Sequence, residues 1–263
     1  MPEGNSIHRF AREHTRDLGG RTVRVSSPQG RFSREASLLN GRAFLRAEAS
    51  GKHLFHHWQG GLIVHVHLGM FGWFYRRDAS DAQPRPTVRM RLATPEVTWD
   101  LIGPPTSELV TDQERARILA RLGPDPLAPR PGARRFARAL ANHRKTVGDA
   151  LLDQRVSAGV GNIYRAEALF LTGIHPLRPA AALDPAAAAA VWQTLRGLMR
   201  RGTREGRTTT VAADELDPAE RRSGVEAFYV YQQERCRRCG GRIRRFPLTD
   251  RVMYACPKCQ RRR

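Results

Sequence analysis

The sequence predicts an α+β protein with more than one domain, in which a β-sandwich or barrel precedes a helical region and a metal-binding hairpin. Three observations predict it. Short stretches between residues 21 and 101 alternate apolar and polar side chains, residues 133–202 have helical periodicity, and all four cysteines follow residue 235. Alternation with period two indicates strands, and a period near 3.6 indicates helices. The 263 residues suffice for two domains, each with its own core.

The first predicted element is a helix over residues 5–18, which Gly19 and Gly20 end. Its apolar face is formed at helical spacing by Ile7, Phe10, His14 and Leu18. Strands are then predicted in the stretches RTVRVSS, LIVHVHLG, GWFYRR and VRMRLA, because glycine and proline separate them as they separate antiparallel strands.

Residues 102–132 are rich in proline and glycine, which predicts a domain boundary. Helices are predicted beyond it in RRFARALANH, TVGDALLDQ, NIYRAEALFLTG and PAAAAAVWQTLRGLMRR. Residues 203–226 are polar and aperiodic, which predicts a mobile loop. We therefore divide the chain into a first domain, a linker, a helical domain and a cysteine-containing segment, over residues 1–120, 121–132, 133–228 and 229–263.

The formal charge of +20 and the isoelectric point near 11.3 indicate a polyanionic partner, with nucleic acid foremost. Arginine supplies most of this charge, because Lys52, Lys145 and Lys258 are the only lysines. The planar guanidinium suits phosphate and guanine edges. A GC-rich genome would also enrich arginine, although codon bias does not explain the sign of the charge. No apolar run of about 20 residues and no signal peptide are present, so we expect a soluble intracellular protein with no membrane partner.

Two cysteine pairs, Cys236 with Cys239 and Cys256 with Cys259, each have the spacing C-x2-C, and sixteen residues separate them. Two such knuckles can surround one Zn²⁺ with four thiolates and leave no position for water, which predicts a structural zinc ion. An iron–sulfur cluster or two disulfides would also fit the count. The many arginines nearby make this hairpin a candidate DNA clamp.

The first residues, MPEG, offer a nucleophile. If an aminopeptidase removes Met1, Pro2 has a secondary α-amine with a pKa of about 7.7 to 8, so far more of it is neutral at pH 7 than of a lysine. This amine can attack C1′ of a deoxyribose, expel the base and form an iminium. Glu3 could protonate the ring oxygen. Taken alone, the two residues also fit an ordinary disordered start.

Seven segments occur in order along the chain: MPEGNSIHR, SGKHLFHHW, HVHLGMFG, LGPDPL, LLDQRVSAGVGNIYRAEALF, FYVY and CPKCQ. Together they resemble the formamidopyrimidine-DNA glycosylase and endonuclease VIII family. The resemblance implies an N-terminal β-sandwich, a C-terminal helix-two-turn-helix bundle and a zinc-finger hairpin, with damaged double-stranded DNA bound between the domains. It also implies a base-excision-repair enzyme that removes oxidised bases and cleaves abasic sites by β,δ-elimination through a Schiff base at Pro2.

The same resemblance implies roles for individual residues. Pro2 is the nucleophile, Glu3 the general acid, and Lys52 contacts phosphate and assists the chemistry. Asn162 would hold a phosphate at a turn where Gly159 and Gly161 let the backbone approach it, although a helix-capping asparagine is the local alternative. Arg251 would clamp the phosphates that flank the everted nucleotide.

Eversion leaves a gap in the duplex, and Met70 with its neighbour Phe71 matches the position of an intercalating wedge. Both could instead be core residues of a strand. The histidines at 53, 56, 57, 65 and 67 suggest a second metal site, but we expect them to be packed or hydrogen-bonded, with His65 and His67 on one face.

The match departs from the formamidopyrimidine branch at two places. Asn5 and Ser6 replace a second Pro-Glu, so a pocket carboxylate is missing, and Gly148 replaces a lysine. Both departures favour the endonuclease VIII branch and oxidised pyrimidines such as thymine glycol and dihydrouracil, with 8-oxoguanine secondary. The polar loop 203–226 would cover the everted base.

Two other functions compete with this interpretation. A catalytically silent protein of the same fold could recognise damaged DNA, but Pro2, Glu3 and Lys52 are all present. A zinc-ribbon module in transcription or on the ribosome would leave the N-terminal motif and the asparagine turn unexplained. We expect a monomer in the bacterial cytoplasm, associated with the nucleoid.

Overall fold

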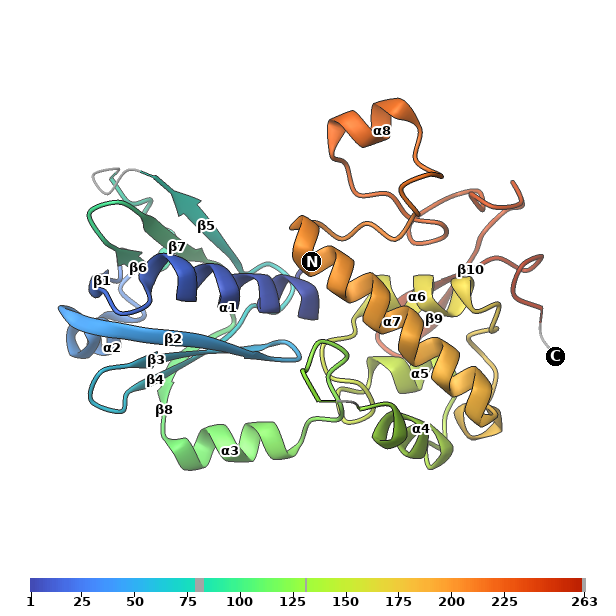
Figure 1. The fold of residues 1–263 in the computed structure, drawn as a ribbon, viewed down its shortest axis with the longest axis horizontal. Helices are drawn as coiled ribbons and strands as arrows, with labels where there is room; N and C mark the ends of the chain where they lie inside the picture. Colours follow the sequence, from blue (N-terminus) through green and yellow to red (C-terminus); the bar gives the residue numbers. More distant parts are fainter. Residues whose placement is uncertain (79–82, 131, 262–263) are drawn as a thin grey trace. The chain divides into compact units, whose positions relative to one another are not determined.

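The computed structural model describes residues 1–78, 83–130 and 132–261, so position 131 of the expected linker and the last two positions of the expected finger lie outside the described residues. The chain folds as two compact units, Met1–Ala120 and Arg121–Arg263 (Figure 1). Each has its own hydrophobic core. No helix in the described ranges combines the length and the apolar composition of a membrane span.

The first unit contains an eight-stranded antiparallel sheet in the order β5-β7-β6-β1-β2-β3-β4-β8. Its elements are α1 Gly4–Leu18, β1 Thr22–Ser26, α2 Ser33–Leu39, β2 Arg42–Ser50, β3 His53–Trp58, β4 Ile63–His67, β5 Trp73–Arg77, β6 Val88–Ala93, β7 Thr98–Ile102, β8 Thr106–Val110 and α3 Asp112–Ala120. Strand β1 pairs with β2 through Thr22 and Val23 and with β6 through Arg24–Ser26. This change of partner lets the sheet fold into the two halves of a sandwich, as predicted.

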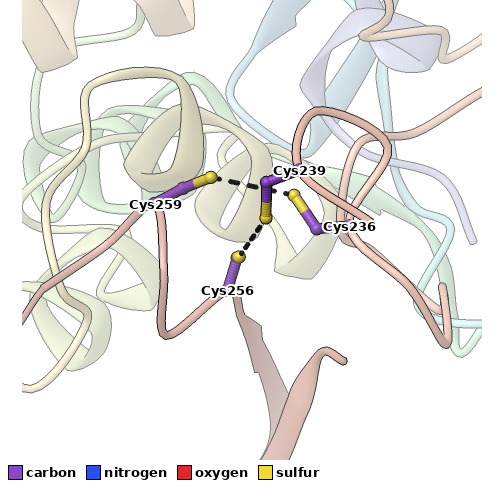
Figure 2. A group of neighbouring side chains, drawn as sticks. All are labelled: Cys236, Cys239, Cys256 and Cys259. Atoms are coloured by element: carbon purple, nitrogen blue, oxygen red, sulfur yellow. Dashed lines mark hydrogen bonds between the residues drawn. The ribbon is translucent and has the colours of Figure 1, made fainter. Parts of the chain in front are cut away.

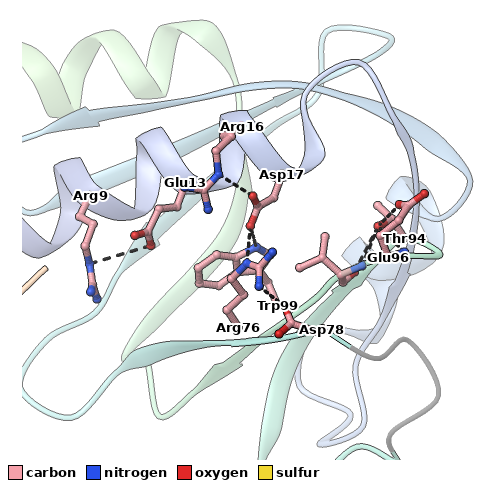
Figure 3. A network of polar contacts seen from close by, with 10 residues as sticks. Arg9, Glu13, Arg16, Asp17, Arg76, Asp78, Thr94, Glu96 and Trp99 are labelled. Atoms are coloured by element: carbon pink, nitrogen blue, oxygen red, sulfur yellow. Dashed lines mark hydrogen bonds and ion pairs between the residues drawn. The ribbon is translucent and has the colours of Figure 1, made fainter.

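Helix α1 packs against β2 and β3 of one half of the sheet and against β5 and β7 of the other. Phe10 contacts Trp73 of β5 and Trp99 of β7, with ring centroids 5.1 and 6.1 Å apart. At the end of the helix, the buried carboxylate of Asp17 accepts hydrogen bonds from Arg76 at 2.8 Å and from the Trp99 indole at 3.2 Å (Figure 3). A buried carboxylate needs such donors, and these anchor α1 on β5 and β7.

Residues 102–120 contain more structure than their composition predicted. Strand β8 extends the sheet beside β4, and α3 follows it. Helix α3 has no buried residue, so it lacks the apolar stripe from which helices are predicted. The short helix α2 was also not predicted, because only Ala36 and Leu39 are buried on it.

The second unit is built from helices and a two-stranded hairpin. Its elements are α4 Ala133–Ala141, α5 Val147–Leu152, α6 Asn162–Leu171, the 3-10 helix η1 Ala180–Ala182, α7 Pro185–Glu205, α8 Pro218–Ser223, β9 Arg244–Leu248 and β10 Arg251–Ala255. Helix α5 begins with a capping box between Thr146 and Asp149. Two turns then lead into α6, which gives the helix-two-turn-helix arrangement that the resemblance implied.

The expectation of a mobile loop over residues 203–226 is wrong for much of that segment. Helix α7 continues to Glu205, and α8 has its own capping box between Asp217 and Glu220. Thr208, Thr209 and Thr210 are buried although they are polar. Thr210 reaches Glu167 of α6, a tertiary contact that no local pattern reveals.

Candidate active site and metal centre

The predicted nucleophile and acid lie at the start of α1. Glu3 is the N-cap residue, and its carbonyl oxygen accepts a hydrogen bond from the amide of Ser6 at 3.0 Å. Pro2 is buried and Glu3 has 0% exposure, whereas Met1 is 46% exposed. Removal of Met1 would therefore leave the Pro2 amine beside a carboxyl group held inside the fold.

Lys52 occupies the tight turn between β2 and β3, after Gly51, whose φ of 57° suits such a hairpin. Strand β2 runs back along α1, because Ala47 and the Thr15 hydroxyl exchange hydrogen bonds of 2.8 and 3.3 Å. From Thr15 to Gly4 the helix rises about 16 Å, and from Ala47 to Gly51 the strand advances about 13 Å. The Lys52 turn thus returns to the end of the unit where α1 begins, with Pro2 and Glu3.

Three histidines follow Lys52 on the same face of β3 and β4. His53 Nδ1 lies 2.9 Å from His65 Nε2, and His65 Nδ1 lies 3.2 Å from a Glu108 carboxylate oxygen. His67 Nδ1 accepts from the amide of Gly69 at 3.2 Å. Burial, assisted by the charge of Lys52, lowers the pKa of His67, and burial with neighbouring positive charge lowers that of His53 to about 4. These side chains are therefore neutral at pH 7.

The remaining two histidines of this group are also hydrogen-bonded. His56 Nε2 lies 3.0 Å from His14 Nδ1 in the sandwich core, and His57 Nε2 lies 3.1 Å from Glu48. Packing and hydrogen bonding thus account for all five histidines. Sequence reasoning did not identify Glu108 as the partner of His65, because the two residues are 43 positions apart and meet only across β4 and β8.

The candidate wedge residues lie in the turn between β4 and β5. Met70 is 41% exposed and Phe71 81%, so neither is a core residue of a strand. A Cβ on Gly69 would approach Pro105 to 2.7 Å, and one on Gly72 would approach the carbonyl of Leu68 to 2.3 Å. The flanking glycines therefore allow a tight turn that presents two large apolar side chains to solvent.

Asn162 is the first residue of α6 and not its cap, which is Gly161. Its Nδ2 donates to the carbonyl of Val252 in β10 at 3.0 Å, and its Oδ1 accepts from Arg165. The local alternative, a helix-capping asparagine, is therefore wrong. Gly159 before it has a φ of 92°, a backbone conformation that favours glycine.

Arg251 is exposed at the start of β10, after a two-residue turn in which Thr249 has a φ of 56°. Two arginines of the first knuckle lie elsewhere and have structural roles. Arg237 pairs with Glu220 of α8, and the Arg238 guanidinium lies 4.6 Å from the ring centroid of Phe170. Arg251 thus differs from Arg237 and Arg238 in its position at the tip of the hairpin.

The four cysteines converge, with all Sγ atoms within 4.8 Å of one another (Figure 2). Cys239 and Cys256 have Sγ atoms 3.5 Å apart, and those of Cys236 and Cys259 are 3.9 Å apart. Disulfide sulfurs would be about 2.05 Å apart, so the thiols are free. Sulfurs about 2.3 Å from one tetrahedral ion are about 3.8 Å apart, which these distances match. The four thiols can therefore hold one metal ion.

Both knuckles are held by the surrounding chain. Gly240, with a φ of 66°, donates its amide to the carbonyl of Cys236 at 2.8 Å. Gln260 is fully buried, accepts from the amide of Cys256 at 2.9 Å and donates to the carbonyl of Ile174 at 2.9 Å. The second knuckle is thereby attached to the loop that follows α6.

Glu167 of α6 is a fully buried residue whose role the sequence did not reveal. Its carboxylate accepts from the backbone amides of Tyr229, Val230 and Tyr231 at 2.9, 2.8 and 2.8 Å. These amides belong to the FYVY segment that leads into the cysteine hairpin. Burial raises the pKa of Glu167, and the hydrogen bonds that it accepts oppose this shift. One buried carboxyl group therefore fixes the path of that segment against α6.

Two family models match the chain, one for each unit. The formamidopyrimidine-DNA glycosylase N-terminal domain matches residues 1–105, and the formamidopyrimidine-DNA glycosylase H2TH domain matches residues 122–214.

Curated relatives match along almost the whole chain. "Endonuclease 8 1" of Mycobacterium tuberculosis is 43% identical over 273 residues, covering 99% of this chain and 100% of that protein. The formamidopyrimidine-DNA glycosylase of Thermus thermophilus is 30% identical, covering 99% and 98%.

Solved structures show the same fold. The MutM (Fpg) protein of Thermus thermophilus superposes with a TM-score of 0.77 at 30% identity, covering 98% of both chains. A Lactococcus lactis Fpg, solved with DNA that contains N7-benzyl-Fapy-dG, has a TM-score of 0.81 at 22% identity and covers 99% of this chain and 100% of that one.

Proposed function

Because the chain belongs to the formamidopyrimidine-DNA glycosylase and endonuclease 8 family of bifunctional DNA glycosylases and abasic-site lyases, we propose that it excises oxidised pyrimidines from duplex DNA with Pro2 as nucleophile. The observation that carries the proposal is the position of Pro2, Glu3 and the Lys52 turn at one end of the first unit. A nucleophile, an acid and a cation at one place are the groups that this reaction needs.

The reaction begins when the neutral Pro2 amine attacks C1′ of the everted nucleotide. The C1′–N bond to the damaged base breaks, and the Pro2 nitrogen loses its proton. The C1′–O4′ bond of the sugar ring then opens, O4′ takes a proton, and the Pro2 nitrogen and C1′ form an iminium. Loss of a proton from C2′ then expels the 3′ phosphate, and a second elimination expels the 5′ phosphate, which completes β,δ-elimination. Hydrolysis of the iminium returns the amine.

Glu3 and Lys52 have different parts in this scheme. The carboxyl group of Glu3, buried next to Pro2, is suited to protonate the sugar ring oxygen and then to shuttle protons. The ammonium of Lys52, at the tip of its hairpin, is suited to contact a phosphate next to the lesion.

DNA binding is assigned to the second unit and to one turn of the first. Asn162 and Arg251 would contact phosphates, with Gly161 allowing close approach, while Met70 would fill the gap that the everted nucleotide leaves. A zinc ion on Cys236, Cys239, Cys256 and Cys259 would stabilise the hairpin that carries Arg251.

The first turn of α1 supports the preference for oxidised pyrimidines. Asn5 and Ser6 are buried there, and the turn has no acidic residue, so the second carboxylate of the formamidopyrimidine branch has no counterpart. Gly148 supports this preference less strongly. A Cβ at that position would lie 2.6 Å from Leu248 and 2.9 Å from the Pro176 carbonyl, so packing alone requires glycine.

Borohydride trapping tests the proposal. Protein with Met1 removed is mixed with a duplex that contains one thymine glycol or one abasic site, and borohydride reduces any iminium to a stable amine. We expect a covalent protein–DNA adduct that mass spectrometry locates at Pro2. An adduct at Lys52 or another lysine would overturn the Pro2 assignment.

The control is the same protein with a short N-terminal extension, which converts the Pro2 amine into an amide. We expect it to bind abasic-site DNA within about twofold of the unextended protein and to give no adduct. Binding without trapping by either protein would favour the alternative function, recognition of damaged DNA without catalysis.

A further inference from the structure

A continuous hydrogen-bonded chain leads from the Lys52 turn to solvent. His53 follows Lys52, contacts His65 at 2.9 Å, and His65 contacts Glu108 at 3.2 Å. His65 is 5% exposed, whereas the Glu108 side chain is 55% exposed. His65 and Glu108 are cross-strand partners on β4 and β8, so the sheet register holds the chain in place.

The order of donors and acceptors in this chain is determined by its outer end. An ionised carboxylate can only accept, so Glu108 requires the hydrogen of neutral His65 on Nδ1. His65 Nε2 then has a lone pair and must accept the hydrogen of His53 Nδ1. His53 therefore has its hydrogen on Nδ1 and an acceptor lone pair on Nε2. A carbonyl or carboxylate partner at Nδ1 selects the same tautomer in other proteins.

The charges around His53 maintain this state. Burial lowers the pKa of His53 to about 4, and the charge of Lys52 contributes to the shift. The other groups near it are His67 and His65 on β4 and Glu108 on β8. The neighbouring carboxylate on β2, Glu48, is engaged by Arg115 at 2.6 Å and by His57 at 3.1 Å.

We propose that Glu108, acting through His65, holds His53 as a hydrogen-bond acceptor beside Lys52 and is a positioning residue of the active site. His53 follows Lys52 directly in the chain, so a lone pair on His53 Nε2 would attract and orient the ammonium, whereas a hydrogen there would repel it. The inference rests on the proposed function, because it gives this hydrogen-bonded chain the role of orienting the Lys52 ammonium. The hydrogen-bonded chain itself takes no part in the bonds that the reaction forms and breaks.

The chain reverses when His65 becomes protonated. An imidazolium donates from both nitrogens, so His53 Nδ1 must become the acceptor and its Nε2 must carry the hydrogen. Burial lowers the pKa of His65, while its bond to Glu108 opposes that shift. Glu108→Gln removes the opposing charge and moves protonation of His65 to lower pH. It also removes the group that enforces the tautomer at neutral pH, because an amide can donate as well as accept.

The first test measures tautomers without any reaction. Nitrogen-15 NMR of the histidine side chains in the DNA-free protein is expected to show His53 and His65 with hydrogen on Nδ1. In Glu108→Gln, we expect His65 to be a mixture of its two neutral tautomers. Hydrogen on Nε2 of His53 in the unmodified protein would overturn the inference.

The second test measures single-turnover cleavage of an abasic-site duplex at saturating protein. Glu108→Gln is expected to slow cleavage about three- to tenfold at pH 7.5, with a smaller change in the dissociation constant of DNA, and to move the acidic limb of the pH profile to lower pH. The control is Glu96→Gln, which removes a surface carboxylate bonded to Arg21 and should leave both quantities unchanged.

A second pair of variants separates positioning from packing. His65→Phe breaks the hydrogen-bonded chain. His57→Phe is its control, because His57 lies on the neighbouring strand β3 and contacts Glu48, outside that chain. Only His65→Phe is expected to slow cleavage. Equal cleavage rates for Glu108→Gln and the unmodified protein would overturn the inference and leave the proposed function intact. If NMR shows the expected tautomers but borohydride traps no adduct at Pro2, the result contradicts the proposed function alone.

Discussion

Asn162 donates from Nδ2 to the carbonyl oxygen of Val252 at 3.0 Å, a contact that joins positions 90 residues apart. Arg165, which is fully buried, donates to the Asn162 Oδ1 and to the carbonyl of Gly148 at 3.3 Å. The turn before α6 and strand β10 are therefore held together through one side chain. The candidate phosphate-binding residue is positioned by the hairpin that carries the cysteines.

Replacement of Asn162 by alanine is expected to weaken DNA binding about tenfold or more, because it removes a phosphate donor and the contact with β10. Fluorescence anisotropy with an abasic-site duplex measures the dissociation constant. Asn142→Ala is the matched control, since Asn142 is exposed at the end of α4. Equal affinity for the two variants would contradict the role of Asn162.

Replacement of the turn residues Met70 and Phe71 by alanine is expected to slow excision from duplex DNA about tenfold while the melting temperature is unchanged, because both side chains are exposed. Single-turnover kinetics on thymine glycol in duplex and in single-stranded DNA measure the effect. A wedge is not needed in a single strand, so an equal loss on both substrates would exclude this role.

Cys256→Ser is expected to remove the metal ion and to disrupt the hairpin, because Cys256 is buried and three remaining ligands bind metal far more weakly. Elemental analysis should find one zinc per chain in the unmodified protein and none in the variant. The control is Lys258→Ala, because Lys258 lies between Cys256 and Cys259 in the sequence and is not a candidate ligand. Full zinc content in Cys256→Ser would contradict the assignment.

The buried pair of His14 and His56 is expected to make the first unit unstable in mild acid. Burial lowers both pKa values, that of His56 to about 3, with the charges of Arg9 and His57 contributing. A lowered pKa means that the unfolded chain binds the proton more readily, so stability is present above pH 6.5 and falls between about 6.5 and 3. For His56, the free energy of unfolding should decrease by about 2 kcal/mol from pH 7.5 to pH 5, and protonation of His14 should decrease it further.

Urea unfolding at several pH values, followed by tryptophan fluorescence, measures this slope. The double variant with His14→Leu and His56→Leu removes both titrating groups and should show a smaller decrease. An undiminished slope in the double variant would assign the acid sensitivity to other groups.

Local patterns in the sequence were sufficient for the main elements and for the candidate metal ligands. Helix α1 has its apolar residues at helical spacing, and Ile7, Phe10 and Leu18 are all buried. The cysteine spacing predicted a convergence that the structure shows. Such features are local, because a helix period and a knuckle each involve residues a few positions apart. The resemblance to a known family added the helix-two-turn-helix arrangement.

The sequence by itself therefore determined the α+β class, the candidate nucleophile and the four thiols, whose chemistry depends on residue type and short spacing. The tertiary structure decided which polar groups meet. His65 needs Glu108 from another strand, Asn162 needs Val252 from the hairpin, and Glu167 binds three amides more than 60 positions away. Burial makes such partners obligatory, because an unpaired polar group inside a protein is costly, but only the folded chain determines which groups become partners.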